Sequence, residues 1–309
     1  MDVSIIIVNY NTRDYLKNCI ESILKYTQNI DFEIIVSDNG STDGSLEMIK
    51  SDFPQVILIE NNENLGFGKA NNRGLKVAKG KYIFYLNSDT VLLNNAVKIF
   101  FDYFEENGQT QKIGGLGTNL LNPDMTTGFS YGEIFGGNCK SFSDIKKDVF
   151  LYALRTWNKF FKSLFGYKLK KIQNNPVCEK KIGKVGHILG ADLFVKNDEN
   201  AFFDENFFMY MEETDLEYQM SKKDLSMFLI EGPQIIHFGG VASNNIEYEV
   251  LDTAKFSRIN YFISRVYFCK KNFSKGFGLF FIKFFTLITW LNPLVFSKTK
   301  KYIGKMLKI

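Results

Sequence analysis

The stretch Val3-Ser4-Ile5-Ile6-Ile7-Val8-Asn9-Tyr10-Asn11-Thr12 joins a continuous apolar run to a polar turn. An uninterrupted, β-branched run of this kind is typical of a strand that is buried on both faces. Similar runs occupy 32–37, 56–60 and 82–86, and helical patterns separate them. Strands that alternate with helices predict an α/β fold with a doubly wound, mostly parallel, Rossmann-like central sheet and flanking helices.

Polar segments follow three of the predicted strands, after Val8, Ser37 and Leu86. In doubly wound sheets ligands bind beyond the carboxyl ends of the strands. We therefore expect the three polar segments to lie along one edge of the sheet, where they can share one ligand.

Two acids stand directly at these strand ends. Asp38 can accept hydrogen bonds from a nucleotide base or ribose, although an Asp before Asn-Gly also commonly forms a turn. Asp89, in Asn87-Ser88-Asp89, suits a hard divalent ion such as Mg²⁺ or Mn²⁺, which prefers oxygen ligands and substrate phosphates. The alternative for Asp89 is helix capping by this segment.

Two further clusters carry candidate chemistry. Glu212-Glu213-Thr214-Asp215 follows an aromatic run, and a carboxylate against an apolar wall suits a general base because its pKa is raised. The alternative is acidic charge in the first turn of a helix, which accounts for Asp215. His237, one of two histidines, follows Ile235-Ile236 and is either a metal ligand or a satisfied core histidine. His187 is interpreted as structural.

Taken in order, these segments resemble the family 2 inverting glycosyltransferases of the GT-A type, especially the bacterial rhamnosyltransferase-like branch. The resemblance covers about residues 2–243 and is carried by 3–11, 36–44, 64–72, 86–89, 190–192, 203–210, 212–216 and 237–240. Each segment alone is a weak signal, whereas the ordered set is a strong one.

The resemblance implies a role for each matching residue. Nucleotide binding falls to Asn9, Asn11, Asp38, Asn71 and Ser88. Asp89 and His237 are implied as ligands of Mn²⁺ or Mg²⁺. Glu213 is implied as the catalytic base, with Glu212 in reserve, and Gly190, Ala191 and Asp192 as the border of the donor sugar and acceptor.

The sequence departs from the family pattern at two positions. Asn87 replaces the first acid of the Asp-X-Asp element, so Asp89 and His237 remain as protein ligands and the metal affinity should be modest. Glu213 stands where the family often has Asp, and the extra methylene moves the carboxylate by about 1 Å.

The implied activity is metal-dependent hexosyl transfer, with inversion, from a nucleoside-diphosphate sugar to a hydroxyl of a glycan or polyprenyl-linked acceptor in surface polysaccharide synthesis. Rhamnose is the first donor sugar that the resemblance suggests, while glucose, galactose and N-acetylated sugars stay open. The alternatives are a non-catalytic sugar-nucleotide-binding module and a membrane-surface scaffold with the same fold. A nucleotidyltransferase is disfavoured because no glycine-rich basic signature lies near the N-terminus.

The domain prediction places the catalytic domain at 1–250, with a basic aromatic insertion at about 128–185, and a helical tail at 251–309. The insertion is either a packed helical excursion or a flap on the acceptor or membrane side, and no nucleic-acid module accompanies it. The tail has twelve Lys or Arg and one acid, Asp252, in a chain of net charge +4. This charge predicts an anionic membrane surface as partner.

Within the tail, 276–296 is rich in Phe but is interrupted by Lys283. It fits a helix lying in the membrane interface better than a spanning helix, and the alternative is a buried helix. Four scattered Cys without a CxxC pair indicate free thiols in a reducing compartment, and no signal peptide is expected. The predicted location is cytoplasmic, peripheral at the inner face of the cell membrane.

Overall fold

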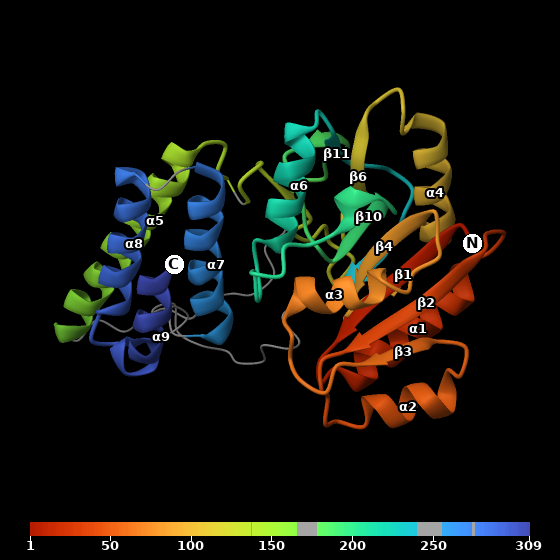
Figure 1. Ribbon diagram of the computed structural model, residues 1–309, viewed down its shortest axis with the longest axis horizontal. Coiled ribbons are helices and arrows are strands. Elements are labelled where there is room, and N and C mark those ends of the chain that lie inside the picture. The colour runs from red at the N-terminus through yellow and green to blue at the C-terminus, as the bar shows by residue number, and fades with distance from the viewer. Residues whose placement is uncertain (137, 166–177, 240–254, 274–275) are drawn as a thin grey trace. The chain divides into compact units, whose positions relative to one another are not determined.

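The computed structural model describes residues 1–136, 138–165, 178–239, 255–273 and 276–309 (Figure 1). Its contacts divide the chain into two compact units. We call Met1–Gly137, Asn175–Phe208 and Glu212–Ala242 the sheet unit, and Asn138–Asn174, Met209–Met211 and Ser243–Ile309 the helical unit. The predicted boundary at about residue 250 lies outside the described residues and stays a prediction.

An eight-stranded sheet forms the centre of the sheet unit, in the order β3-β2-β1-β4-β10-β6-β11-β8. Its strands are β1 (Val3–Asn9), β2 (Phe32–Asp38), β3 (Ile57–Glu60), β4 (Tyr82–Asn87), β6 (Ile113–Gly117), β8 (Gly183–Val185), β10 (Asp192–Lys196) and β11 (Ser226–Leu229). Strands β3, β2, β1 and β4 run parallel, β11 is parallel to β6, and β10 runs antiparallel between β4 and β6. The predicted α/β fold with a mostly parallel sheet is confirmed.

Two small antiparallel sheets accompany the main one. Strand β12 (Ile235–His237) pairs with β5 (Thr90–Leu92), and β7 (Tyr131–Gly132) pairs with β9 (His187–Ile188). The first pairing matters for the site because it sets His237 opposite Thr90, next to Asp89.

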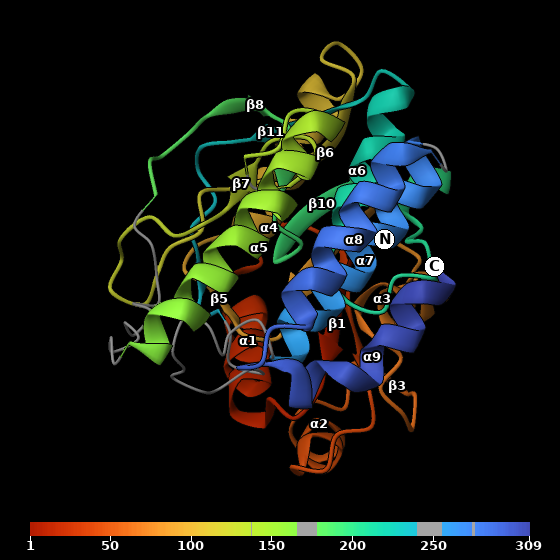
Figure 2. The same ribbon diagram turned by 90° about the vertical axis from the view of Figure 1, so that its left-hand side faces the viewer.

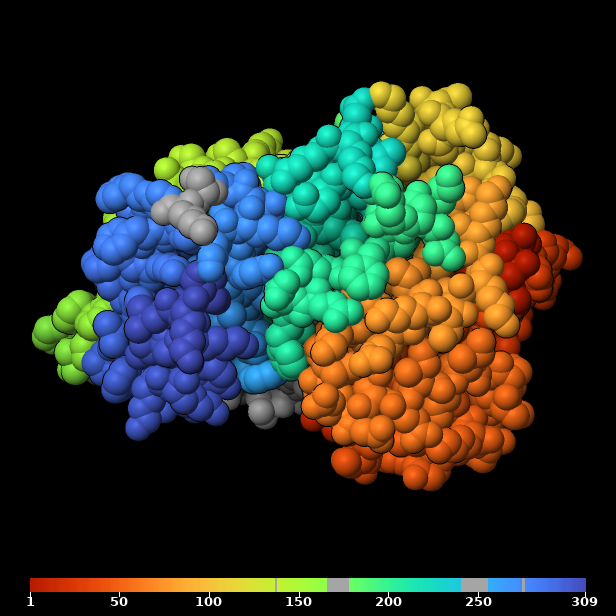
Figure 3. All heavy atoms as spheres, in the orientation of Figure 1, coloured from red at the N-terminus to blue at the C-terminus, as the bar shows by residue number. Residues whose placement is uncertain are grey.

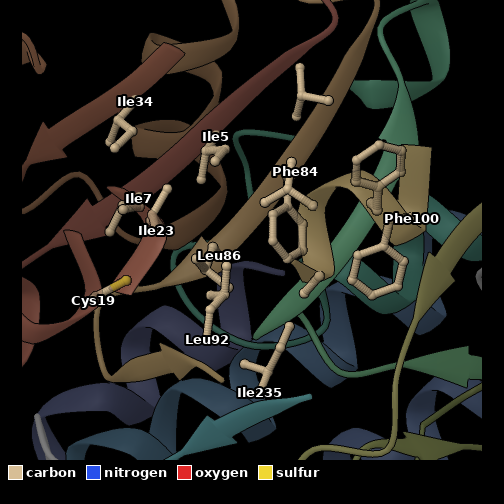
Figure 4. Close-up of a cluster of buried hydrophobic side chains, with 14 of the residues drawn as sticks. Ile5, Ile7, Cys19, Ile23, Ile34, Phe84, Leu86, Leu92, Phe100 and Ile235 are labelled. Atoms are coloured by element: carbon tan, nitrogen blue, oxygen red, sulfur yellow. The ribbon is translucent and has the colours of Figure 1, made fainter. Parts of the chain in front are cut away.

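Helices cover both faces of the sheet. They are α1 (Arg13–Tyr26), α2 (Ser45–Asp52), α3 (Phe67–Leu75), α4 (Ala96–Asn107) and α6 (Glu212–Lys222), with the short 3₁₀ helix η1 (Glu199–Ala201). Ile5 and Ile7 of β1 pack with α1 and α4 on one face, whereas Ile6 packs with α6 on the other. Figure 4 shows the first cluster, with Ile5, Phe84 and Leu86 pointing toward Ile23 and Phe100. The apolar runs are continuous because both faces are buried.

Phe194 of β10 lies at the centre of an aromatic cluster in this core. Its ring centroid is 5.4 Å from Tyr82, 5.9 Å from Phe84 and 5.6 Å from Phe100. We expect Phe194→Ala to lower the free energy of unfolding by about 3–5 kcal/mol, because it leaves a cavity among rigid rings. Urea denaturation measures the loss, and the conservative Phe194→Leu should lose clearly less. Equal losses for the two variants would contradict this packing.

The helical unit contains α5 (Phe142–Leu164), α7 (Phe256–Phe273), α8 (Phe277–Trp290) and α9 (Phe296–Lys308). Figure 2 shows α5 and α8 side by side. Trp157 Nε1 donates to the Ile288 carbonyl at 3.0 Å, and Asn292 Nδ2 donates to the Thr156 carbonyl at 3.1 Å. The described part of the predicted insertion therefore includes one long helix that packs against the tail. Among the described residues no helix has both the length and the hydrophobicity to cross a membrane.

Candidate active site

The carboxyl ends of β1, β2 and β4 lie together, as the sequence predicts (Figure 1). In the strand register Asn9 stands opposite Asp38, and Val8 stands opposite Asn87. The three polar segments that follow these strands therefore share one edge of the sheet.

A chain of hydrogen bonds between buried side chains links the three segments. Asn9 Nδ2 donates to Asp38 Oδ1 at 2.7 Å, and Thr12 Oγ1 donates to Asn9 Oδ1 at 2.7 Å. The hydroxyls of Thr12 and Ser88 lie 2.8 Å apart. Thr12 stands at the N-cap position of α1, but its hydroxyl makes no capping hydrogen bond. It takes part in the hydrogen bonds between the loops instead. The strand-end loops are thus one preassembled frame.

Asp38 also forms a turn, which is the alternative role that its sequence context predicts. Its Oδ2 accepts from the amides of Gly40 and Ser41 at 3.0 and 2.8 Å, and the residue is buried. An ionised carboxylate offers about four lone-pair sites, so these bonds leave capacity for a ligand donor. Asn11 has a left-handed backbone (φ 53°), and its Oδ1 accepts from the Thr42 amide at 2.8 Å. The nucleotide contacts of Asp38 and Asn11 stay predictions.

Two neighbouring asparagines on α3 act differently. Asn71 is buried and bonds within its own helix, to the Phe67 carbonyl at 3.2 Å. Asn72 holds the segment after η1, since its Nδ2 donates to the Phe203 carbonyl at 2.8 Å and its Oδ1 accepts from the Phe203 amide at 3.0 Å. In Figure 3 the orange surface of the α3 region adjoins the green surface of the segment after η1. The sequence did not reveal this role of Asn72.

Gly66, just before α3, makes a second contact with that segment. Its φ is +83°, and a Cβ there would lie 1.9 Å from the Phe208 carbonyl oxygen. The same oxygen accepts from the Phe67 amide at 3.1 Å. Only glycine fits this position, because it combines a left-handed backbone with the close approach of another backbone.

Asp89 and His237 lie together although 147 residues separate them in the chain. The β5–β12 pairing and a 3.0 Å bond from the Phe238 amide to the Asp89 carbonyl hold the two strands. His237 Nε2 lies 3.3 Å from Asp89 Oδ1 and 3.4 Å from Asn87 Nδ2. Both side chains are partly exposed. The helix-capping alternative for Asp89 is wrong, because β5 follows this segment and α4 begins only after Asn95.

The side chains of Asp89 and His237 supply some of the ligands that a divalent ion needs. It offers one carboxylate and one imidazole nitrogen, and both are ligands that Mn²⁺ and Mg²⁺ sites use or tolerate. Within the described part of the chain, no group of three or more His, Cys, Asp or Glu is placed to hold a metal. A bound ion would therefore need phosphate or water oxygens to complete its coordination.

The acids of α6 face two different neighbours. A Cβ on Gly68 of α3 would lie 3.4 Å from Glu212 Cβ, so Glu212 packs toward α3. A Cβ on Gly190 would lie 3.6 Å from Glu213 Cδ, so Glu213 packs toward the turn before β10. Among the described residues, Glu213 Oε2 is buried and has no hydrogen-bond partner.

The turn at Gly190 and Ala191 connects the two clusters. The Asn87 amide donates to the Ala191 carbonyl at 3.1 Å, next to the Asp89–His237 pair, while Glu213 lies close to Gly190. Asp192 is fully buried, and its Oδ2 accepts from the Thr118 amide at 2.7 Å. Burial raises the pKa of Asp192 well above its ordinary value, and nearby Glu217 adds to the shift. In this structure Asp192 thus links the turn to Thr118, just after β6. Its contact with sugars stays a prediction.

Comparison with known proteins supports part of the predicted function. Residues 4–121 match the sequence model of glycosyl transferase family 2. Glycosyltransferase GlyG of Streptococcus pneumoniae serotype 4 (strain ATCC BAA-334 / TIGR4) is 36% identical over 138 residues, which are 43% of this chain and 44% of GlyG. The UDP-Glc:alpha-D-GlcNAc-diphosphoundecaprenol beta-1,3-glucosyltransferase WfaP of Escherichia coli is 39% identical over 112 residues, covering 33% of this chain and 44% of WfaP. The chain thus spans less than half the length of either relative.

A solved structure supports the fold. The mannosyltransferase PcManGT from Pyrobaculum calidifontis, determined in complex with GDP-Man and Mn²⁺, has a TM-score of 0.53 and 12% identity, covering 99% of this chain and 75% of that chain. At this identity the likeness concerns the fold alone. The predicted GT-A fold is confirmed. Residues 4–121 match the family 2 model, whereas membership of the rhamnosyltransferase-like branch stays a prediction.

Proposed function

We propose that this protein is an inverting glycosyltransferase that moves a sugar from a nucleoside-diphosphate donor to a hydroxyl of a glycan or polyprenyl-linked acceptor. The observation that carries the proposal is the link through Gly190 and Ala191, which joins the Asp89–His237 pair to Glu213. This arrangement sets a candidate leaving-group site and a candidate base at the carboxyl edge of the parallel strands, where ligands bind in such sheets. The family 2 match of residues 4–121 supports the same reaction class.

The proposed chemistry needs one displacement. Glu213 removes the proton of the acceptor hydroxyl as that oxygen attacks the anomeric carbon, and the bond from the anomeric carbon to the diphosphate oxygen breaks. The buried Oε2 of Glu213, which has no protein partner among the described residues, is the oxygen available to take the proton. Attack from the face opposite the leaving group inverts the anomeric centre, so no covalent enzyme intermediate forms.

Asp89 and His237 are the residues that would hold Mn²⁺ or Mg²⁺. When bound there, such an ion offsets the negative charge that builds on the departing diphosphate. The frame of Asn9, Asp38, Thr12 and Ser88 fixes the loops that would receive the nucleotide, so little reorganisation is required on binding.

The donor sugar is proposed in order of support. Rhamnose, as its thymidine diphosphate derivative, follows from the sequence resemblance, and glucose as UDP-glucose follows from the name of WfaP. That name also supports a polyprenyl diphosphate-linked acceptor, and the sequence resemblance suggests surface polysaccharide synthesis as the setting. A donor panel that reads nucleoside-diphosphate release, with and without Mn²⁺ or Mg²⁺, tests the proposal. Donor binding without any release, in the presence of acceptor lipids, would instead favour a non-catalytic binding module.

We also propose that the helical unit attaches the protein to the cytoplasmic face of the membrane. Phe277, Phe280 and Phe284 of α8 are 78%, 62% and 46% exposed and form one stripe of the helix. Ring contacts continue from Phe284 through Phe285 to Phe150 of α5, at centroid distances of 5.2 and 5.0 Å. We call these five residues the aromatic face.

The charge of the helical unit favours anionic lipid as its partner. Its described residues include seventeen Lys or Arg against two acids, Asp144 and Asp148. Asp148 is paired with Arg265 at 2.6 Å, and Asp144 caps α5 together with Ser141. Exposed aromatic rings beside an excess of lysines are typical of helices that lie in an anionic membrane interface.

We expect the double variant Phe280→Ser/Phe284→Ser to lower binding to vesicles of anionic phospholipid by about tenfold or more, because it removes exposed apolar area. Sedimentation with phosphatidylglycerol vesicles measures it. The matched control is Phe202→Ser, since Phe202 lies in the sheet unit and is 46% exposed like Phe284. Unchanged sedimentation of the double variant would contradict the proposal.

A further inference from the structure

A buried histidine–glutamate pair lies in the sheet unit, one helical turn from the candidate base. His187 Nδ1 lies 2.5 Å from Glu217 Oε2, and their side chains are only 6% and 1% exposed. The amide of Ile188 donates to both carboxylate oxygens of Glu217, at 3.1 and 3.2 Å. His187 is thus a core histidine, as expected, but its partner is an acid on the helix that carries Glu213.

The pair holds the contact that positions Glu213. Glu217 follows Glu213 by one helical turn, so the two side chains share a face of α6. The chain runs from His187, beside Glu217, to Gly190, beside Glu213. The His187–Glu217 bond therefore fixes how the segment 187–190 lies along α6. It thereby also fixes the position of the Glu213 carboxylate.

The charge interactions of this cluster centre on Glu217. Burial lowers the pKa of His187, but the charge and hydrogen bond of Glu217, with a further contribution from Glu213, raise it overall. Burial raises the pKa of Glu217, which His187 opposes and Glu213 reinforces. Burial also raises the pKa of Asp192, and the charge of Glu217 raises it further. Glu217 thus acts on Asp192, His187 and Glu213, and His187 is the basic side chain bonded to it.

We propose that His187 is a positioning residue which, paired with Glu217, holds Glu213 beside Gly190 and offsets the charge of Glu217 there. The inference rests on the role proposed for Glu213. Without the imidazolium, a buried Glu217 carboxylate would repel Glu213 and favour its protonated form, which cannot take a proton from an acceptor hydroxyl. The Ile188 amide bonds would still hold Glu217 in place, so the charge and the position of this acid are separable.

Titration of His187 by NMR tests this coupling without any need for turnover. The chain has two histidines, so His237→Asn leaves His187 as the single imidazole signal. We expect its pKa to lie above 6.5, and to fall by about half a unit or more when Glu213→Gln removes the neighbouring charge. Because coupling is reciprocal, that fall equals the effect of His187 on Glu213. Glu199→Gln, in an exposed pair with Lys223, should leave the pKa unchanged.

The acid limb of the pH profile of kcat/KM gives the second reading. His187→Gln should move that limb to higher pH, because uncompensated Glu217 makes Glu213 harder to ionise. Adding Glu217→Gln to this variant should return the acid limb to its original pH. A pair with a purely structural role would not produce this reversal. The proposal is overturned if the pKa of His187 is the same with and without the Glu213 carboxylate. It is also overturned if His187→Gln and the double variant both lose rate while the acid limb of kcat/KM stays at the same pH. Full turnover of Glu213→Gln would instead overturn the proposed base, while the NMR coupling could still be present.

Discussion

Replacing Glu213 by Gln is expected to lower kcat for sugar transfer by about 10²–10⁴-fold, because the amide cannot accept the proton of the acceptor hydroxyl. Gln keeps the shape of the side chain, so its packing near Gly190 is retained and the KM for the donor should change little. Steady-state release of nucleoside diphosphate in the presence of acceptor measures both constants. Thermal unfolding of the same variant checks that the fold is intact.

Glu212→Gln is the matched control for this result. Glu212 is the adjacent acid, but it packs toward Gly68 of α3 rather than toward Gly190. We expect its kcat to fall by less than about tenfold. A large loss for Glu212→Gln together with a small loss for Glu213→Gln would reverse the assignment of the base.

Replacing Asp89 by Asn is expected to lower kcat/KM by about 10²–10³-fold, because it removes the carboxylate that lies beside His237 in the proposed metal site. The measurement is nucleoside-diphosphate release as a function of Mn²⁺ concentration. Asp102→Asn is a suitable control, since Asp102 is a half-exposed acid of α4 paired with Lys98. Retained activity and metal response in Asp89→Asn would contradict the proposed ligand.

The converse variant sharpens this prediction. Asn87→Asp adds a second carboxylate beside Asp89, at a side chain that already lies 3.4 Å from His237 Nε2. We expect the Mn²⁺ concentration for half-maximal activity to fall, since more carboxylate ligands raise the affinity of a hard-ion site. An unchanged metal response in this variant would place the metal elsewhere.

The sequence predicts the strands and the shared edge because both depend on local pattern. Ile5, Ile6 and Ile7 alternate between two buried faces, and a run with both faces buried has no polar position. The proximity of Asp89 and His237 depends on the β5–β12 pairing across the chain, which no local pattern encodes. It was expected only through the resemblance to a family.

Other features of the site were not predicted because their partners are distant in sequence. Thr12 stands at the N-cap position of α1, but its hydroxyl bonds to Asn9 and lies 2.8 Å from that of Ser88. Asn72 clamps Phe203, and His187 pairs with Glu217, in each case through a contact that only the folded sheet unit creates. Short polar side chains can serve caps, turns or networks, and the tertiary structure decides which.

A crystal structure of the full chain with nucleoside diphosphate and Mn²⁺ tests the central claim most directly, because anomalous scattering locates the metal independently of the phosphates. The account predicts a Mn²⁺ peak at Asp89 and His237, bound also by diphosphate oxygens, with the nucleoside over the loops that carry Asn9 and Asp38. A nucleotide bound away from the carboxyl edge of β1, β2 and β4, or a metal without contact to Asp89, would contradict it.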